Sequence, residues 1–360
     1  MIQSILTHNM PPWLSGEGPD ADVVVSSRVR LARNLAQHRF PGRASMFERA
    51  EVFQEVSAAF RETPQCSSFN PVSFSKLDKN EQRFLVEERL AGAGLENAEG
   101  ERGIILDETR RVSVMVNGED HLKLQILDAG LRPQELWGVV DAIDDAVGMR
   151  LTYAFDGRSG FLTCRPADAG TGLRASFLVH LPGLTLARSV DTVLRGAAQM
   201  GVSARGFLGE HSPVAGDLYA LSNASAMGST ENAILDNTAT VARHIAGVER
   251  KARQRLLEEA HLRLIDRIQR AWGVLCHARL LGVNEFLALA SDLRLGIECN
   301  LFDKCTRSEL NRLTLFMLPG HLRAYYKKTM DDEECRAARA DLVRAFFKRK
   351  KTGKRTHENG

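Results

Sequence analysis

Two hairpin signals in the middle of the chain constrain its fold more than any other feature. Strand-like runs at 103–106 and 112–116 precede Asn117-Gly118, a dipeptide that favours a two-residue β-turn, and 121–126 is the expected returning strand. Runs at 151–155 and 160–163 flank Asp156-Gly157 in the same way, and 175–181 is a further strand. Adjacent hairpins predict an antiparallel sheet, and helical patterns at 46–62 and 76–91 make the fold class α+β.

Beyond residue 228 the pattern becomes purely helical. Apolar residues recur at helical spacing from Ile234 to Val248, and Ser229 or Thr230 can cap the first helix. We therefore predict four parts: a lead-in at 1–21, a sheet-containing domain at 22–250, a helical domain at 251–347 and a basic flexible tail at 348–360.

Composition and charge exclude several classes of protein. The chain is 44% hydrophobic and 26% charged, which is typical of soluble globular proteins. No apolar run reaches the length of about 18 residues that a membrane helix needs, so no membrane partner and a cytoplasmic location are expected. The net charge is +3, but the segment 348–360 carries six basic and one acidic side chain. The slightly acidic remainder argues against a nucleic-acid partner.

Several basic residues lie next to strands or glycines. Arg28 and Arg30 are two apart, so on an extended backbone both side chains project to one face. Arg174 follows a glycine-containing loop, Arg205 precedes a glycine, and Lys123 lies in the strand after the Asn-Gly turn. Guanidinium groups bind phosphate oxygens bidentately, so converging arginines would predict a polyphosphate ligand. Taken singly, each is more typical of an exposed surface arginine, and no Walker or Rossmann glycine motif is present.

Acidic residues offer a second kind of site. Glu119 and Asp120 follow the Asn-Gly turn, and Glu210 lies in Gly209-Glu210-His211. Such residues are usually solvated, but carboxylates that the fold brings together can hold a cation such as a guanidinium. Spacing along the chain does not decide between these alternatives.

Five segments in register resemble the ATP:guanido phosphotransferase (phosphagen kinase) family, in its bacterial protein arginine kinase branch. They are Ser26–Asn34, Asn117–Lys123, Gly170–Ser176, Arg205–Glu210 and Leu218–Asn223. Their order and spacing agree from about residue 22 to about residue 345. The resemblance implies a phosphagen-kinase-like antiparallel sheet flanked by helices in the domain 22–250, followed by an all-helical C-terminal domain.

The resemblance also implies an activity: transfer of the ATP γ-phosphoryl group to the guanidino group of arginine residues in proteins. Glu119 and Glu210 would hold the acceptor and one would take its proton, while Mg²⁺ would bridge phosphate oxygens, with no metal cage in the protein. Arg89 lies near a position where relatives often have an adenine-contacting histidine. The ATP site implied by the resemblance comprises Ser26, Ser27, Arg28, Val29, Arg30, Arg89, Lys123, Arg174, Ala175, Ser176, Phe177, Leu178, Arg205, Gly206, Phe207, Leu208 and Gly209.

The substrate loop departs from the family pattern. Arg165 stands where the family has a cysteine and Asp168 where it has an asparagine, while Cys164 lies one residue early. Arg165 would either pair with Glu119 or Glu210, as an internal mimic of the acceptor, or pair with Asp168 and leave the pocket open. Two further changes replace a glutamate by Gly118 and an arginine by Lys123.

Three functions follow from these observations. The first is a protein arginine kinase with reduced activity, the second a pseudokinase that binds ATP or arginine-bearing partners, and the third a kinase for a small guanidino compound. Expected partners are arginine-bearing protein substrates, a zinc-binding activator protein and the Clp protease machinery, with a homodimer as the assembly.

Overall fold

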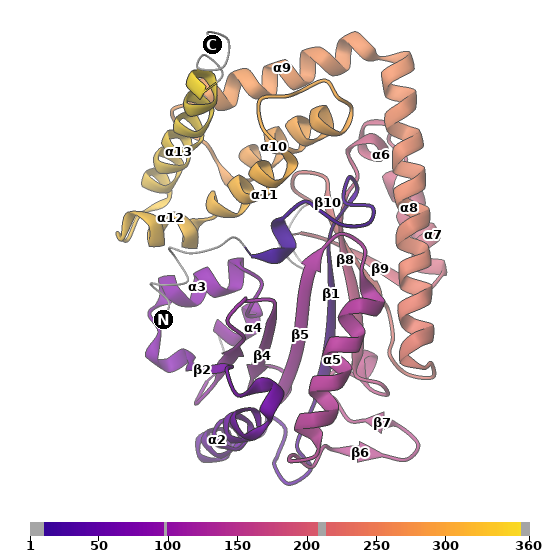
Figure 1. The fold of residues 1–360 in the computed structure, drawn as a ribbon, viewed down its shortest axis with the longest axis vertical. Coiled ribbons are helices and arrows are strands. Elements are labelled where there is room, and N and C mark those ends of the chain that lie inside the picture. The colour runs from indigo at the N-terminus through magenta and orange to yellow at the C-terminus, as the bar shows by residue number, and fades with distance from the viewer. Residues whose placement is uncertain (1–10, 97–98, 208–213, 354–360) are drawn as a thin grey trace.

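The centre of the molecule is an eight-stranded antiparallel sheet (Figure 1). The computed structural model describes residues 11–96, 99–207 and 214–353. The strand order is β2-β3-β4-β5-β1-β8-β10-β9, and β6 pairs with β7 separately. The α+β class and the predicted antiparallel sheet are thereby confirmed. The strands are β1 (Val24–Arg33), β2 (Asn70–Ser73), β3 (Gly103–Leu106), β4 (Val112–Val116), β5 (Leu122–Ala129), β6 (Phe155–Asp156), β7 (Gly160–Phe161), β8 (Leu173–His180), β9 (Val202–Gly206) and β10 (Leu218–Asn223).

Helices begin where the sequence supplies caps. Ser45 and Asp78 form capping boxes with the glutamates three residues later, and the Thr230 hydroxyl accepts a hydrogen bond from Ala233 N. The helices are α2 (Met46–Glu62), α3 (Lys79–Glu87), α4 (Ala93–Glu96), α5 (Pro133–Gly148), α6 (Pro182–Leu186), α7 (Val190–Gln199), α8 (Glu231–Glu259), α9 (His261–His277), α10 (Val283–Glu298), α11 (Arg307–Phe316), α12 (Pro319–Tyr326) and α13 (Asp332–Gly353), with 3-10 turns η1 (Pro12–Leu14), η2 (Pro64–Cys66), η3 (Phe74–Lys76) and η4 (Pro166–Asp168).

The two faces of the sheet differ in chemistry. On one face, Val29 and Leu31 of β1 and Ala175 and Phe177 of β8 are buried, and α5 and α8 cover them. Burying each large apolar side chain contributes roughly 1.5–3 kcal/mol. The alternate residues of the same strands project to the other face, where polar and basic side chains gather. Helices α5 and α8 therefore cover the apolar face of the sheet, and the polar face is the candidate for a functional site.

The connection between β4 and β5 differs from the predicted two-residue turn. Val116 pairs with Leu122, so five residues, 117–121, join the strands. Asn117 has the left-handed φ of 56° that the dipeptide favours. Its side-chain amide, however, donates to the carbonyl oxygens of Arg49 (2.7 Å) and Glu101 (2.9 Å). These tertiary hydrogen bonds widen the turn into a loop that carries Glu119 and Asp120.

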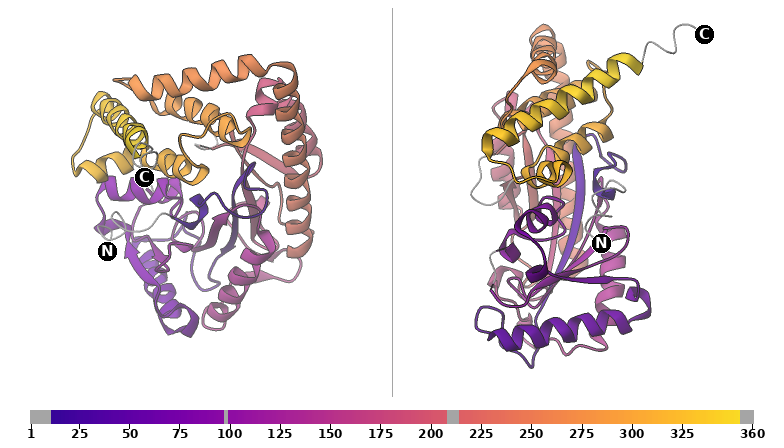
Figure 2. Two further views of the ribbon diagram at one scale, coloured as in Figure 1. Left: turned by 45° about the horizontal axis from the view of Figure 1, so that its top comes forward. Right: turned by 90° about the vertical axis from the view of Figure 1, so that its left-hand side faces the viewer.

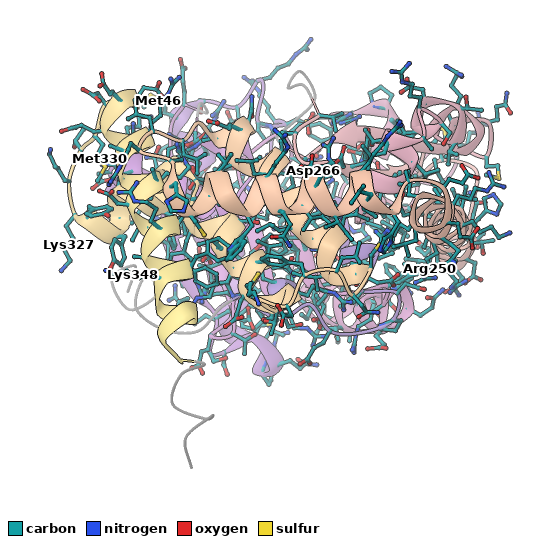
Figure 3. All side chains as sticks on the ribbon, turned by 90° about the horizontal axis from the view of Figure 1, so that it is seen from above. Met46, Arg250, Asp266, Lys327, Met330 and Lys348 are labelled. Carbon is teal, nitrogen blue, oxygen red and sulfur yellow. The ribbon has the colours of Figure 1, made fainter. Side chains whose placement is uncertain are left out.

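The C-terminal part is helical throughout its described residues, as predicted. Helix α8 runs along the side of the sheet and α9 crosses the top (Figures 1 and 2). Seen from above, α9, which carries Asp266, lies beside α13, which carries Lys348 (Figure 3). Helix α8 is continuous through residues 250 and 251, where a domain boundary was expected, and α13 continues to Gly353, past the expected start of the tail.

The long helices α8 and α13 prompt the question of membrane insertion. Within the described part of the chain, no helix combines the length and the apolar character needed to cross a bilayer. Helix α8, the longest at 29 residues, has charged residues along much of its length.

Candidate active site

Arginines from neighbouring strands share one face of the central sheet. In the ladder between β1 and β8, Arg30 lies opposite Arg174, and Arg28 lies opposite Ser176. Directly opposed residues of an antiparallel pair project to the same face. The register from β8 through β10 to β9 places Arg205 on this face as well. We call the side chains of Arg28, Arg30, Arg174 and Arg205 the arginine face.

The hydrogen bonds of the arginine face are incomplete. Arg28 Nε donates to Ser176 Oγ at 3.2 Å, and Arg174 donates to Asp168 Oδ1 at 3.2 Å. The buried Nε of Arg30 has no hydrogen-bond partner among the described residues. A buried donor without a partner costs about 1–3 kcal/mol. An oxygen of a bound anion would remove this cost.

The pKa values of these arginines are lowered mainly by burial and further by the like charges of their neighbours. Burial, with the charges of Arg89 and Arg174, lowers the pKa of Arg28 to about 9. Burial and the charges of Arg28 and Arg174 hold the pKa of Arg30 well below its usual value. Burial and Arg30 lower the pKa of Arg89 to about 10, and burial with Arg174 lowers that of Arg205. Because a guanidinium remains charged near pH 7, a polyanion such as a triphosphate fits this face.

Arg89 extends the arginine face toward an aromatic patch. It follows the end of α3 with a left-handed φ of 64°. Its guanidinium carbon lies 4.6 Å from the ring centre of Phe207 and 5.4 Å from that of Trp13. Trp13 and Phe207 line one cavity together with Leu178. Flat cationic and aromatic groups of this kind can stack on a base. Trp13 was missed by the sequence analysis, because nothing local links the lead-in to the sheet.

Carboxylates and cations alternate beside the arginine face. Lys123 Nζ lies 3.0 Å from Glu119 Oε2. Arg165 Nε lies 3.8 Å from Glu119 Oε1 and 3.9 Å from Asp168 Oδ2. Asp168 also binds Arg174, which belongs to the arginine face. The two pairings proposed for Arg165, with Glu119 and with Asp168, therefore occur together, and a guanidinium already lies between these two carboxylates.

A buried polar network holds the loop that carries Glu119. Asp120 Oδ1 accepts hydrogen bonds from Asn34 Nδ2 and from Cys164 N, both at 2.8 Å. Asn34 Oδ1 accepts from His121 N at 2.9 Å. Asn34 and Asp120 are almost completely buried, so the network positions Glu119 relative to the end of β1. From the sequence, Asp120 was considered only as a carboxylate that could hold a cation and Asn34 was assigned no role, although both lie in segments that carry the family resemblance.

Cys164 is placed close to the carboxylates but is not a thiolate. The residue as a whole is exposed, although its thiol is partly desolvated. Burial of the sulfur environment and the charge of Asp120, which also accepts a hydrogen bond from the thiol, raise the pKa of Cys164 to about 12. The group therefore stays protonated near pH 7. It does not supply the negative charge that the family cysteine would bring to a bound guanidinium.

Four residues predicted for the ATP site project away from the arginine face. Val29, Ala175 and Phe177 are buried in the apolar core on the opposite face. Ser27 Oγ donates to the carbonyl oxygen of Gly130 at 2.6 Å. Because these four side chains point away from the arginine face, only their main-chain atoms could contact a nucleotide bound there.

Of the remaining residues predicted for the ATP site, some lie in strands and others lie outside the described residues. Ser26 is buried in β1 two residues before Arg28, and Gly206 ends β9. Leu208 and Gly209 lie outside the described residues, and so does Glu210, which was predicted as a catalytic residue. The roles of these residues stay predictions.

His121 provides a pH-dependent test of this loop. Its Nδ1 accepts from Leu35 N and its Nε2 bonds the Arg39 carbonyl, both at 3.0 Å, and burial lowers its pKa to about 4. The unfolded chain takes up this proton at about pH 6.5, so stability falls as the pH falls below that value. Because of this group, we expect the free energy of unfolding of the wild-type protein to fall by about 2 kcal/mol between pH 7 and pH 5.

Urea unfolding at both pH values measures the loss. His121→Gln should lose less stability than wild type over this interval, and the exposed control His244→Gln should match wild type. An equal loss in His121→Gln would show that other groups cause the acid sensitivity.

The fold is similar to that of solved phosphagen kinases. The duplicated taurocyamine kinase of Schistosoma mansoni superposes with a TM-score of 0.60 at 24% identity, over 68% of this chain and 36% of that chain. A lombricine kinase superposes with a TM-score of 0.56 at 22% identity, over 66% of this chain and 68% of that chain. This chain thus spans little more than a third of the taurocyamine kinase. At these identities the likeness shows a shared fold.

Sequence comparison identifies the family. Residues 51–252 match the family described as ATP:guanido phosphotransferase, C-terminal catalytic domain, and residues 261–358 match the protein-arginine kinase McsB C-terminal domain. The protein-arginine kinase of Moorella thermoacetica is 38% identical over 93% of this chain and 97% of that protein. That of Halalkalibacterium halodurans is 35% identical over 96% and 98%. The chain therefore belongs to the ATP:guanido phosphotransferase family, in the branch of the protein-arginine kinases.

Proposed function

We propose that this protein transfers the γ-phosphoryl group of Mg-ATP to a guanidino nitrogen of arginine residues in other proteins. The observation that carries the proposal is a face of clustered arginines next to a group of carboxylates. The arginine face suits a triphosphate, and the Glu119 and Asp168 carboxylates suit a guanidinium. Arg165 supports the second part of the proposal, because its Nε lies 3.8 Å from Glu119 and 3.9 Å from Asp168.

Phosphoryl transfer to a guanidinium requires that the phosphate charge be neutralised and that the acceptor lose a proton. Phosphoryl transfer depends mainly on alignment and on neutralising the charge of the transferred group, which the arginine face would do. ATP supplies the phosphoryl group. The acceptor guanidinium, whose pKa exceeds about 12, becomes a nucleophile only as it loses a proton. Glu119 would hold that group in line and accept the proton as the new bond forms. Glu210 would be the second carboxylate, by family resemblance.

A protein-bound acceptor is favoured over a free one by the C-terminal helical region. Its match to the protein-arginine kinase domain covers residues 261–358, and the relatives of similar length are named protein-arginine kinases. The kinases of taurocyamine and lombricine share the fold alone. A small guanidino compound therefore remains the second alternative.

A pseudokinase is the first alternative, and one observation favours it. Arg165 lies between Glu119 and Asp168, where an acceptor would have to bind. Glu119 is also paired with Lys123, and Gly118 removes a carboxylate that the family has. An acceptor must displace Arg165 from its ion pairs with Glu119 and Asp168, so we expect weakened acceptor binding in an otherwise functional site.

Removing Arg165 should therefore increase activity. Half-exposed ion pairs contribute up to about 1 kcal/mol each, so Arg165→Ala should raise kcat/KM for a protein acceptor by about five- to thirty-fold. The change should appear mainly in KM for the acceptor. Initial-rate kinetics with an unfolded arginine-rich protein provide the measurement.

Arg158→Ala removes the same charge from the exposed turn between β6 and β7 and should leave the rate unchanged. A loss of activity in Arg165→Ala would mean that Arg165 orients the acceptor or the phosphates, which contradicts its role as a competitor.

A competition assay tests the proposed function against its alternatives. The protein is incubated with Mg-ATP labelled in the γ-phosphate, free arginine and an arginine-rich unfolded protein in one vessel. Label in the protein as acid-labile phosphate supports the proposal, and label in free arginine alone supports the small-guanidine kinase. Binding of Mg-ATP without any transfer supports the pseudokinase.

Other expectations from the resemblance stay predictions. Among the described residues, no group of three or more His, Cys, Asp or Glu side chains is arranged to hold a metal ion. Mg²⁺ bound through phosphate oxygens, a zinc-binding activator, the Clp protease machinery and a homodimer are expectations from the family. A cytoplasmic location is an expectation from the sequence, and none of these rests on a contact in the structure.

A further inference from the structure

The end of helix α3 is held by helix α12, which belongs to the C-terminal helical region (Figure 1). The Glu87 carboxylate accepts hydrogen bonds from Gly320 N at 2.9 Å and His321 N at 3.1 Å, and lies 2.9 Å from His321 Nδ1. A carboxylate here satisfies amides that lack partners within the helix and complements the helix dipole. The Glu87 side chain is only 4% exposed, so this docking contact is buried.

His321 joins two carboxylates of α3 and its cap. Its Nε2 lies 3.6 Å from Glu88 Oε1, and Glu88 Oε2 lies 2.7 Å from the guanidinium of Arg110. The Phe84 ring lies against the imidazole, with 4.3 Å between ring centres. Burial lowers the pKa of His321, but Glu87 and Glu88 raise it by more, so that the net shift is upward. Removing one member of such a buried network leaves the others without their partners.

This network ends next to a predicted nucleotide-binding residue. Glu88 caps α3, and Arg89 follows it with a φ of 64°. A residue other than glycine is strained in this region, so surrounding contacts must hold it there. The Arg89 carbonyl accepts from Gln125 Nε2 at 2.6 Å, and its guanidinium lies 4.6 Å from the Phe207 ring. The direction of the Arg89 side chain therefore depends on where the last turn of α3 lies.

We propose that Gly320 and His321 are positioning residues for nucleotide binding, which act through Glu87 and Glu88 on Arg89. Docking of α12 holds the last turn of α3 and keeps the Arg89 guanidinium beside the arginine face. The C-terminal helical region thereby contributes to the affinity for Mg-ATP without touching the nucleotide. This inference rests on the proposed function, because it takes Arg89 as a residue of the ATP site.

Gly320 provides a variant that disturbs the docking and little else. A Cβ atom at this position would lie 2.8 Å from Glu87 Oε2, closer than real Cβ atoms approach, and 3.0 Å from Phe84 N, a tight contact with the backbone. Alanine is a better helix former than glycine, so Gly320→Ala should not unfold α12 itself. Gly273, in α9, is the matched control, since no atom lies within 4 Å of its added Cβ.

The experiment combines calorimetric binding of Mg-ATP with transfer kinetics in the full chain. Gly320→Ala and His321→Gln should each weaken Mg-ATP binding about three- to ten-fold and raise KM for ATP by a similar factor. The value of kcat at saturating ATP should stay within about two-fold, since the acceptor carboxylates are untouched. Gly273→Ala should match wild type in all three quantities.

A double-mutant cycle decides whether the effect passes through Arg89. Arg89→Ala should weaken binding by itself, and adding Gly320→Ala or His321→Gln should weaken it no further. Additive losses, or unchanged binding in Gly320→Ala and His321→Gln, would overturn the inference. Unchanged binding in Arg89→Ala would instead contradict the ATP site of the proposed function, so the two failures can be told apart.

Discussion

Glu119→Gln is expected to lower the rate of phosphoryl transfer to arginine by roughly 10²- to 10⁴-fold, the usual range for losing a general base. The amide keeps the shape of the carboxylate but can neither hold a guanidinium by charge nor accept its proton. Mg-ATP binding should stay within about two-fold of wild type, because β1, β8 and β9 carry the arginine face, whereas Glu119 lies in the loop before β5. Single-turnover kinetics and calorimetry measure the two quantities on the same preparation.

A surface glutamate provides the control for this substitution. Glu135 pairs with Arg132 at the start of α5, and its side chain is 60% exposed. Glu135→Gln should therefore leave transfer and binding unchanged. If Glu119→Gln retained more than about a tenth of the wild-type rate, the proton would leave by another route, and the assignment of Glu119 as the base would be wrong.

Arg30→Gln is expected to have opposite effects on activity and on stability. Loss of one preorganised cationic donor to the phosphates should lower kcat/KM by about 10²- to 10³-fold. In the absence of nucleotide, the same change removes a buried Nε without a partner and relieves repulsion from Arg28 and Arg174. Stability should rise by about 1 kcal/mol, as at other strained functional sites. Urea unfolding without nucleotide and steady-state kinetics test the two effects.

Arg33, on the same strand, provides a control substitution that should have the opposite effect on stability. It projects to the other face, where it binds the buried Asp144 at 2.7 Å. Arg33→Gln would leave this carboxylate without its partner, so it should destabilise the protein by about 3–5 kcal/mol. If Arg30→Gln also destabilised the protein, the arginine face would not be a strained anion site, and the argument from its charge would fail.

The sequence predicted the bounds of those helices and strands whose ends depend on residues close by in the chain. Helix α2 has the predicted bounds, 46–62, because the Ser45 capping box lies within four residues of its start. Strands β3 and β4 likewise have their predicted bounds. The turn after β4 was predicted too short, because the Asn117 amide binds carbonyl groups of Arg49 and Glu101, which no local pattern reveals.

The candidate site was predictable only where it depends on residues close together in the chain. The spacing of Arg28 and Arg30 placed both on one face, but their approach to Arg174 depends on a register between strands about 140 residues apart. The contact of His321 with Glu87 joins residues 234 positions apart. Such contacts follow from tertiary packing, and the family resemblance supplied what spacing could not.

The most direct test of the account is to map phosphoarginine by mass spectrometry. An arginine-rich unfolded protein is incubated with Mg-ATP and the wild-type chain, in parallel with Glu119→Gln, and kept at neutral or basic pH. The account predicts phosphoryl groups on arginine side chains in the wild-type sample and almost none with Glu119→Gln. Absence of phosphoarginine in the wild-type sample, while Mg-ATP binds, would contradict it.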